Sequence, residues 1–528
     1  MTMKKNYKEC IYYFCLSLFI GSFSTIVSAH DDETLITNVL IIDGTGSEAY
    51  SGSLLMKGDV IASIFRGSLN DFNHDNTVDG MGMVLAPGFL DSHSHFDQGL
   101  KDQPSAKAAI TQGITTIIRG MDGFSARPDG KDTIVYGEHL SVDEFNNLMK
   151  DIPTAVNIAS FSSHNSIRSV VMKDDFRREA TALEIKEMSE LVEADMQSGA
   201  LGLSTGLEYD PGIYSSTDEV IILAKIASKY GGRYKSHMRS EDRYFWDSIN
   251  EIIEIGVKAN IPVNIDHLKL AAISLWGMDK ELLSILNNAR ERGIDITADI
   301  YPYTAWQSTI TVLYPDRNFD DANEAKFILE NISSPDDILF VAHKIHPDYV
   351  NKTLRQIASE KNKTPEEMLS IIAKESFELS EGASAIESII GKSMDEKDVI
   401  ALLNWEYSNV TTDGGLDCSH PRGCGSFTKV IDDYIGDKDL GSIERVIHKM
   451  TGLTAKNLGI QDRGEIKVDS YADLILFDPD RIQDNATFEQ PNRLSDGIHS
   501  VWVNGKQVLA DGVLTEHLPG KIILREVN

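Results

Sequence analysis

Side chains that can do chemistry are concentrated in the run Asp91-Ser-His93-Ser-His95, which follows the apolar residues Phe89 and Leu90. Met83, Val84 and Leu85 precede this pair across Pro-Gly punctuation, and the whole apolar run predicts one short buried strand that ends where the polar residues begin. Successive side chains on a strand alternate between its faces, so Asp91, His93 and His95 should point the same way, and two such imidazoles can bind one metal ion. A lone pair of this kind is as often found on an ordinary surface, so a metal site requires further ligands elsewhere in the chain.

Seven further strands are predicted after this run, and they alternate with helical stretches. The strands are expected at residues 114–119, 154–161, 199–205, 233–237, 263–267, 295–301 and 409–413, and helices at 182–198, 217–229, 246–258 and 280–292. Together with the opening strand they make eight, and eight strands alternating with helices predict an α/β fold of the (β/α)8, TIM-like barrel type.

Polar residues follow many of these strands at the end where barrel enzymes carry their catalytic groups. They are His93, His95, Asp122, His164, His237, His267 and Asp413. Imidazole and carboxylate ligands suit a divalent ion such as zinc, with one position left open for water. The predicted reaction class is therefore metal-assisted hydrolysis.

The chain of 528 residues is long enough for such a barrel and an accessory module. Short β-branched runs before residue 85 and after residue 452 predict a small β-sandwich module built from both chain ends. The expected division is a signal peptide at 1–29, the β-module at 30–85 and 453–528, and the barrel at 86–452 with an inserted subdomain at about 306–395. The segment at about 306–395 is predicted to fold as a subdomain, because a structureless loop of its length would be unusual inside a compact domain.

The first residues combine three lysines, an apolar run over 11–27 and a Val-Ser-Ala triplet ending at Ala29. This pattern predicts a cleaved secretory signal peptide and an exported protein, periplasmic or secreted. An uncleaved membrane anchor is the alternative, which the shortness of the run and its serines and glycine disfavour. No membrane attachment is expected after cleavage.

The formal net charge of −31 argues against nucleic acid and anionic membranes as partners, but acidity does not identify a substrate. Cys418 and Cys424 are the only cysteines beyond the predicted signal peptide. Their pairing depends on a geometry that the sequence leaves open. The oligomeric state is also left open.

Longer motifs resemble the D-aminoacylase (N-acyl-D-amino-acid deacylase) family of the amidohydrolase superfamily. They are Ala86-Pro-Gly-Phe-Leu-Asp-Ser-His-Ser-His95, Gly199-Ala-Leu-Gly-Leu-Ser-Thr-Gly-Leu-Glu-Tyr209, Ser236-His-Met-Arg-Ser-Glu241, Thr297-Ala-Asp-Ile-Tyr-Pro-Tyr-Thr-Ala305 and His420-Pro-Arg-Gly423. The resemblance implies zinc, as one or two divalent ions, with His93 and His95 at one position and His237 and His267 at the other. It also implies that Asp413 is the catalytic aspartate beside the first metal.

The resemblance further implies hydrolysis of an N-acylated D-amino acid, whose α-carboxylate would be bound by Lys269, Arg422 and a tyrosine. Tyr301 and Tyr303 both fit that tyrosine, and the sequence leaves the choice open. Asp413 is expected to accept a proton from the attacking water and pass it to the departing amine. His164, at the end of the third strand, either polarises the substrate carbonyl or packs in the interior.

One position departs from the family pattern. The family has a cysteine in a Gly-x-Cys-Gly context after the second strand, where this chain has Gly120-Met-Asp122-Gly123. A thiolate is a soft ligand, whereas carboxylate oxygens are hard and can bridge two ions. We expect Asp122 to replace the cysteine as a metal ligand; the alternative is a loop that has lost its metal role.

Other functions remain open alternatives. A dipeptidase or cyclic amidase of the same superfamily would use the same metal ligands. Gly202-Leu-Ser204-Thr-Gly206 fits the G-x-S-x-G pattern of serine hydrolases, but that motif needs a helix directly after the serine, and Pro211-Gly212 would break it. A non-catalytic binding barrel is disfavoured by the number of candidate ligands.

Overall fold

The computed structural model describes residues 32–69, 74–128, 138–379, 385–435 and 440–526. The predicted signal peptide at 1–29 lies outside these residues. Within the described ranges, none of the helices combines the length and the apolar character needed to span a membrane.

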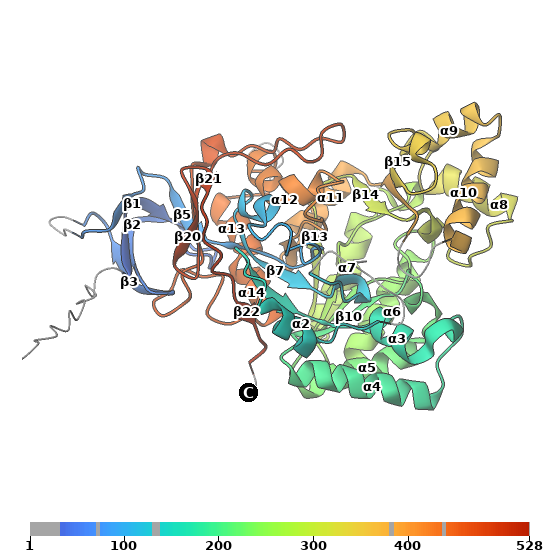
Figure 1. Ribbon diagram of the computed structural model, residues 1–528, viewed down its shortest axis with the longest axis horizontal. Helices are drawn as coiled ribbons and strands as arrows, with labels where there is room; N and C mark the ends of the chain where they lie inside the picture. The colour runs from blue at the N-terminus through green and yellow to red at the C-terminus, as the bar shows by residue number, and fades with distance from the viewer. Residues whose placement is uncertain (1–31, 70–73, 129–137, 380–384, 436–439, 527–528) are drawn as a thin grey trace, which may run out of the picture.

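Both chain ends contribute to one mixed sheet of nine strands. Its strands are β1 (Glu33–Ile41), β2 (Tyr50–Lys57), β3 (Val60–Arg66), β4 (Thr77–Asp79), β5 (Val84–Pro87), β18 (Leu474–Phe477), β19 (Ile498–Val503), β20 (Lys506–Ala510) and β21 (Val513–Leu514). β18 is antiparallel to β5, with Leu474 opposite Pro87, so the two ends of the chain meet at the centre of the sheet. The blue and red strands lie together at one end of the molecule (Figure 1).

Two parallel sheets contain the strands that alternate with helices. One holds β6 (Phe89–Asp91), β7 (Ile114–Arg119), β8 (Asn157–Ser160) and the short C-terminal β22 (Ile522–Ile523); the other holds β9 (Ser162–Ser163), β10 (Gly202–Gly206), β11 (Arg233–His237), β12 (Val263–Ile265), β13 (Ile296–Ile300) and β17 (Ser408–Val410). The seven strands predicted after the opening run are found, each within three residues of its expected bounds.

The opening strand was wrongly predicted as one element. The chain forms β5 in the nine-stranded sheet and then β6 in a parallel sheet, with Gly88 between them. A Cβ atom on Gly88 would lie 2.3 Å from the Thr115 side chain, so only glycine lets the chain pass this close to β7. The Pro-Gly pair therefore marks a change of sheet.

Hydrogen bonds connect the two parallel sheets at both of their edges. At one edge the Leu201 N–H donates to the Ser160 carbonyl over 2.8 Å, and at the other the Asp413 N–H donates to the His93 carbonyl over 2.9 Å. Asp91 strengthens the second edge, because its carboxylate accepts bonds from the hydroxyls of Thr411 and Thr412. Asp91 thus joins β6 to the residues that follow β17.

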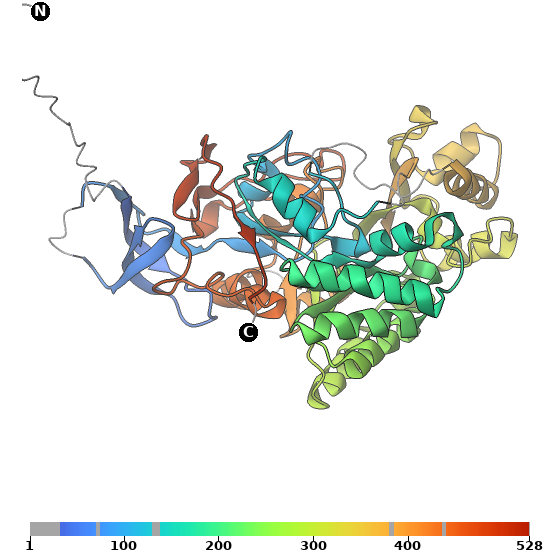
Figure 2. The same cartoon turned by 60° about the horizontal axis from the view of Figure 1, so that its bottom comes forward.

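Helices pack on the outside of these sheets, as the green layer in Figure 2 shows. The four predicted helices are α4 (Ala182–Gln197), α5 (Thr217–Lys229), α6 (Phe245–Ala259) and α7 (Asp279–Glu291), each within one residue of its expected bounds. α4 begins with a capping box in which Thr181 and Glu184 bond each other's backbone N–H groups. The remaining helices here are α1 (Lys107–Ile110), α2 (Val142–Met149), α3 (His164–Met172), α11 (Glu396–Asn404), α12 (Arg422–Asp432), α13 (Ile443–Met450) and α14 (Gly452–Leu458).

Between β13 and β17 the chain forms a separate antiparallel sheet with its own helices. The strands are β14 (Ala305–Ser308), β15 (Ile338–His343) and β16 (Glu387–Lys392), in the order β14-β16-β15, and the helices are α8 (Ala322–Asn331), α9 (Leu354–Glu360) and α10 (Pro365–Leu379). A separate apolar cluster, which includes Ile328, Phe340 and Leu369, holds these elements together. The segment lies at the end of the molecule opposite the nine-stranded sheet (Figure 1).

Candidate functional site

The predicted ligands all lie at the carboxyl ends of the parallel strands. His93 and His95 follow β6, His237 ends β11, and His267 and Asp413 follow β12 and β17. Most of them line a cavity of about 570 Å³ that extends toward the inserted segment. The alternation of strands and helices thus brings together groups that are up to 320 positions apart in the chain.

Asp122 lies at the centre of the four histidines. Its Oδ1 is 3.4 Å from His93 Nε2, 3.4 Å from His267 Nε2 and 3.8 Å from His237 Nδ1, and its Oδ2 is 3.4 Å from His95 Nε2. These separations are long for hydrogen bonds and leave room for an ion between the atoms. The loop can place the carboxylate here because Asp122 adopts a left-handed conformation with φ 54°, which aspartate tolerates.

Asp413 completes the group on the side of the first two histidines. Its Oδ1 lies 3.6 Å from His93 Nε2 and 3.5 Å from His95 Nε2. Donor atoms from His93, Asp122, His267 and Asp413 all lie within 4.8 Å of one another. The predicted pairing of His93 and His95 with Asp413 is therefore the arrangement that the fold produces.

The second ring nitrogen of three histidines faces a carboxylate. The pairs are His93 Nδ1 with Asp266 Oδ2 at 3.4 Å, His237 Nε2 with Glu208 Oε2 at 2.9 Å, and His267 Nδ1 with Glu241 Oε1 at 3.0 Å. The contacts at His237 and His267 are hydrogen bonds, and a carboxylate so placed holds the proton on that nitrogen and leaves the other lone pair free for a metal. The sequence analysis assigned no role to these three acids, although Asp266 and Glu241 lie in the same strand-end segments as His267 and His237, and Glu208 lies in the Gly199–Tyr209 motif.

The electrostatics of the cluster favour a bound cation. Burial opposes protonation of His95 and His267, yet the surrounding carboxylates raise the pKa of each to about 9. Burial would raise the pKa of Asp122, but the positive charges of the surrounding histidines hold it well below its usual range. Within the described residues, His93 Nε2 is buried without a hydrogen-bond partner. The carboxylates of the cluster, Asp122 and Asp413 among them, thus favour positive charge between them and the histidines, and a divalent ion would supply it.

Comparisons with known proteins agree with this geometry. Residues 410–509 match the amidohydrolase family. Over 505 residues the chain is 32% identical to D-aminoacylase of Alcaligenes xylosoxydans xylosoxydans, covering 93% of this chain and 98% of that protein. The chain belongs to the D-aminoacylase family.

Solved structures of D-aminoacylase-family proteins share the whole fold. A crystal structure of D-aminoacylase matches with a TM-score of 0.82 at 30% identity, covering 93% of this chain and 99% of that one. An N-acyl-D-glutamate deacylase from Bordetella bronchiseptica, complexed with zinc and a phosphonate mimic of the tetrahedral intermediate, matches with a TM-score of 0.80 at 28% identity, over 93% and 99% of the two chains.

The residues that the family resemblance assigns to the substrate carboxylate lie beside Asp413. Arg422 Nη1 is 2.7 Å from Asp413 Oδ2, and its guanidinium carbon lies 4.8 Å from the centre of the Tyr301 ring. Lys269 Nζ contacts both oxygens of Glu241, at 2.5 and 2.6 Å. Two cationic groups and one tyrosine therefore face the same corner of the site.

The structure separates the two candidate tyrosines. Arg422 and Lys269 both lie near the Tyr301 ring, 4.8 and 5.8 Å from its centre, and the buried Tyr301 hydroxyl has no hydrogen-bond partner among the described residues. The Tyr303 hydroxyl instead donates to Asp484 Oδ2 at 2.9 Å. Tyr303 is thus bonded to the C-terminal part of the chain, whereas Tyr301 lies beside the two cations that the resemblance assigns to the substrate.

His164 occupies a different place from the one expected of a catalytic residue. It is fully buried at the start of α3, and its Nε2 lies 2.9 Å from Glu219 Oε1, while Arg168 bonds the same carboxylate. His164 is absent from the cavity lining. This geometry favours a structural role for His164 and gives no support to its predicted contact with a substrate carbonyl.

Two further expectations concern the chain around the site. Ser204 lies in the middle of β10, and this strand is followed by a turn and the 3-10 helix Gly212–Tyr214 instead of an α-helix, so the nucleophile elbow of a serine hydrolase is not formed. Cys418 and Cys424, whose pairing the sequence left open, are joined by a disulfide. This bond closes the loop that leads into α12 and its first residue, Arg422.

Proposed function

We propose that this protein hydrolyses the amide bond of N-acyl-D-amino acids and releases a carboxylate and a free D-amino acid. One or two divalent ions, zinc first among them, would be held by His93, His95, Asp122, His237, His267 and Asp413. The observation that carries this proposal is the Asp122 carboxylate surrounded by four histidine nitrogens, in a chain of the D-aminoacylase family.

Asp413 is the residue that would move the proton. A divalent ion in this site lowers the pKa of a water molecule toward about 7 and polarises the amide carbonyl. Burial would raise the pKa of Asp413, but the positive charges of Arg422 and the histidines hold it well below its usual range. Asp413 is therefore ionised at neutral pH. A group that accepts a proton from water and then gives it to the departing amine must start in this ionised form.

Arg422, Lys269 and Tyr301 would orient the amino-acid half of the substrate. Arg422 can bind a carboxylate with two parallel hydrogen bonds, and Lys269 adds a second positive charge. In the present structure these cations bond the acids Asp413 and Glu241. A substrate carboxylate would compete for the same donors and so position the amide over the histidine cluster.

We also infer the larger framework from local contacts. The hydrogen bonds at both edges of the two parallel sheets support a closed (β/α)8 barrel at 86–452, with an inserted subdomain at about 306–395. A bridge between Val60 and Tyr471 supports folding of the nine-stranded sheet onto itself as a sandwich at 30–85 and 453–528. The N-terminal lysines and apolar run support export to the periplasm or medium, after cleavage at residue 29.

The test is hydrolysis of N-acetyl-D- and N-acetyl-L-leucine by protein of measured metal content, before and after chelation and after zinc is restored. Asp413→Asn is expected to lower kcat by at least about 100-fold, since general acid-base catalysis contributes about 100- to 10,000-fold. Asp102→Asn is the control, because Asp102 is an exposed aspartate that is absent from the cavity lining. Turnover of the L-series alone, or of dipeptides or cyclic amides alone, would contradict the proposal.

A further inference from the structure

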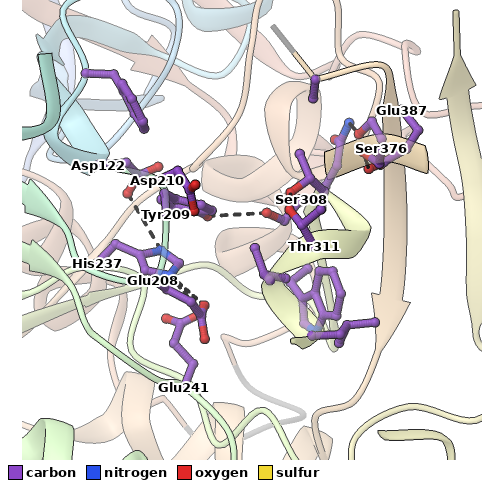
Figure 3. A pocket seen from close by; sticks show the side chains of 18 of the residues that line it. Asp122, Glu208, Tyr209, Asp210, His237, Glu241, Ser308, Thr311, Ser376 and Glu387 are labelled. Carbon is purple, nitrogen blue, oxygen red and sulfur yellow. Dashed lines mark hydrogen bonds and ion pairs between the residues drawn. The ribbon is translucent and has the colours of Figure 1, made fainter. Parts of the chain in front are cut away.

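The cavity continues well beyond the histidine cluster. Figure 3 shows Asp122 and His237 at one end and Ser376 and Glu387, both from the inserted segment, at the other. Tyr209 lies between the two ends, because its ring packs against His237 with centroids 4.4 Å apart and its hydroxyl accepts a bond from Ser308. A substrate bound at the histidines therefore has a second, distant wall to contact.

Glu387 is a buried carboxylate on that distant wall. It is the first residue of β16 and only 3% exposed. Its oxygens accept hydrogen bonds from the Ser376 hydroxyl at 2.6 Å and from the Ile310 N–H at 3.2 and 3.3 Å. All of these donors are uncharged, so the negative charge of Glu387 has no countercharge among them.

The neighbouring charged and titratable groups do not pair with Glu387. Arg317 pairs with Asp210 at 2.9 Å, and the exposed Arg177 lies over the Phe377 ring, with its guanidinium carbon 4.6 Å from the ring centre. His343 lies opposite Glu387 in the pairing of β15 with β16; its Nδ1 accepts a bond from the His346 N–H, its Nε2 is buried without a partner among the described residues, and burial lowers the pKa of the ring. Among the described residues no cationic side chain forms an ion pair with Glu387, and burial raises its pKa to about 7.

The walls near Glu387 suit an alkyl chain that ends in a charge. Val312, Leu313, Ile332 and Phe377 contribute apolar surface to the same cavity. The methylene groups of such a chain would be buried against these side chains. The Glu387 carboxylate lies in surroundings of low dielectric without a countercharge, so it strongly favours a cation beside it. A neutral acceptor such as glutamine could accept the same hydrogen bonds from Ser376 and the Ile310 N–H. These bonds alone therefore do not require a charged side chain at position 387.

We propose that Glu387 binds an ammonium or guanidinium group at the end of the substrate farthest from the metal ligands. This inference rests on the proposed function and adds a substrate class to it. Two sources of the cation share this chemistry: a basic side chain of the D-amino acid, and an amine at the end of the acyl group. In both cases Glu387 is a specificity residue that takes no part in breaking the amide bond.

The test uses two pairs of compounds that differ by one amine. N-acetyl-D-lysine against N-acetyl-D-norleucine tests the side chain, and 6-aminohexanoyl-D-leucine against hexanoyl-D-leucine tests the acyl group. In one pair the amine is expected to raise kcat/KM by about 10- to 100-fold, the range for a hydrogen-bonded ion pair with a buried partner. Glu387→Gln should reduce that ratio to near one, and its metal content, equal to that of the wild type, would show that the variant is folded.

Glu378→Gln is the matched control, since Glu378 is an exposed glutamate on α10, two residues from Ser376, and should leave the ratio unchanged. The inference is overturned if neither pair shows a preference for the amine, or if the preference persists in Glu387→Gln. Calorimetric binding of the same four compounds is measured in parallel. If none is hydrolysed, the proposed function fails, whereas a Glu387-dependent binding preference would still support the cation site.

Discussion

The carboxylate that supports His237 provides a quantitative test of the metal site. Glu208 Oε2 lies 2.9 Å from His237 Nε2, so Glu208 accepts the proton of that nitrogen and leaves Nδ1 free to face Asp122. Glu208→Gln keeps an acceptor oxygen but removes its charge, and Glu208→Leu removes the acceptor as well. The two substitutions therefore separate the contribution of charge from that of orientation.

The expected magnitudes follow from the bond that each variant loses. Replacing a charged acceptor by a neutral one weakens a hydrogen bond by about 1 kcal/mol, or about fivefold in zinc affinity. Removing the acceptor should cost about 10- to 100-fold, the usual effect of losing a group that orients a metal ligand. Glu378→Gln, outside the site, should leave zinc affinity unchanged.

The assay is a competition between metal-stripped protein and a chromophoric chelator of known zinc affinity. The expected order of zinc affinity is wild type, then Glu208→Gln, then Glu208→Leu. Equal affinity in all three proteins would refute a metal-supporting role for Glu208. A greater loss in Glu208→Gln than in Glu208→Leu would refute the reasoning about proton placement.

Variants at four further positions test separate parts of the site. Asp122→Ala should lose bound metal and activity, whereas Asp122→Cys, which restores the family residue, should retain metal; metal analysis and kcat/KM decide. Tyr301→Phe should raise KM several-fold and Tyr303→Phe should not, and equal effects would contradict the assignment of Tyr301 to the substrate. The folded-state pKa of Glu387 is raised from 4.5 to about 7, so its contribution to stability is full below pH 4.5 and is lost as pH rises toward 7. Glu387→Gln should therefore be more stable than the wild type by up to about 3 kcal/mol above pH 7, with no gain below pH 4.5, in denaturant unfolding; a gain that is independent of pH would contradict this cause.

Much of the ligand set could be predicted because it depends on local patterns. His93, His95 and His237 each lie at or just after the end of a predicted strand, and the parallel arrangement of such strands brings their carboxyl ends together. The central position of Asp122 could not be predicted from strand ends, because it depends on a left-handed backbone conformation in the loop after β7. The sequence indicated a substitute ligand there, and only the structure shows that it faces all four histidines.

Features that depend on distant contacts were beyond prediction. Tyr301 and Tyr303 are two residues apart, and what separates them is a bond to Asp484, which lies 181 positions from Tyr303. Glu387 likewise meets the Ile310 N–H across 77 positions. The split of the opening strand at Gly88 follows from a close approach to Thr115 that a single sequence does not reveal.

The most direct test of the central claim is the rate of N-acetyl-D-leucine hydrolysis as zinc is added back to metal-stripped protein, with the L-enantiomer assayed in parallel. The account predicts that D-specific activity is absent without metal and appears as zinc binds at the His93, His95, Asp122, His237, His267 and Asp413 cluster. Full activity in metal-stripped protein, or zinc binding at this cluster without turnover of the D-substrate, would contradict it.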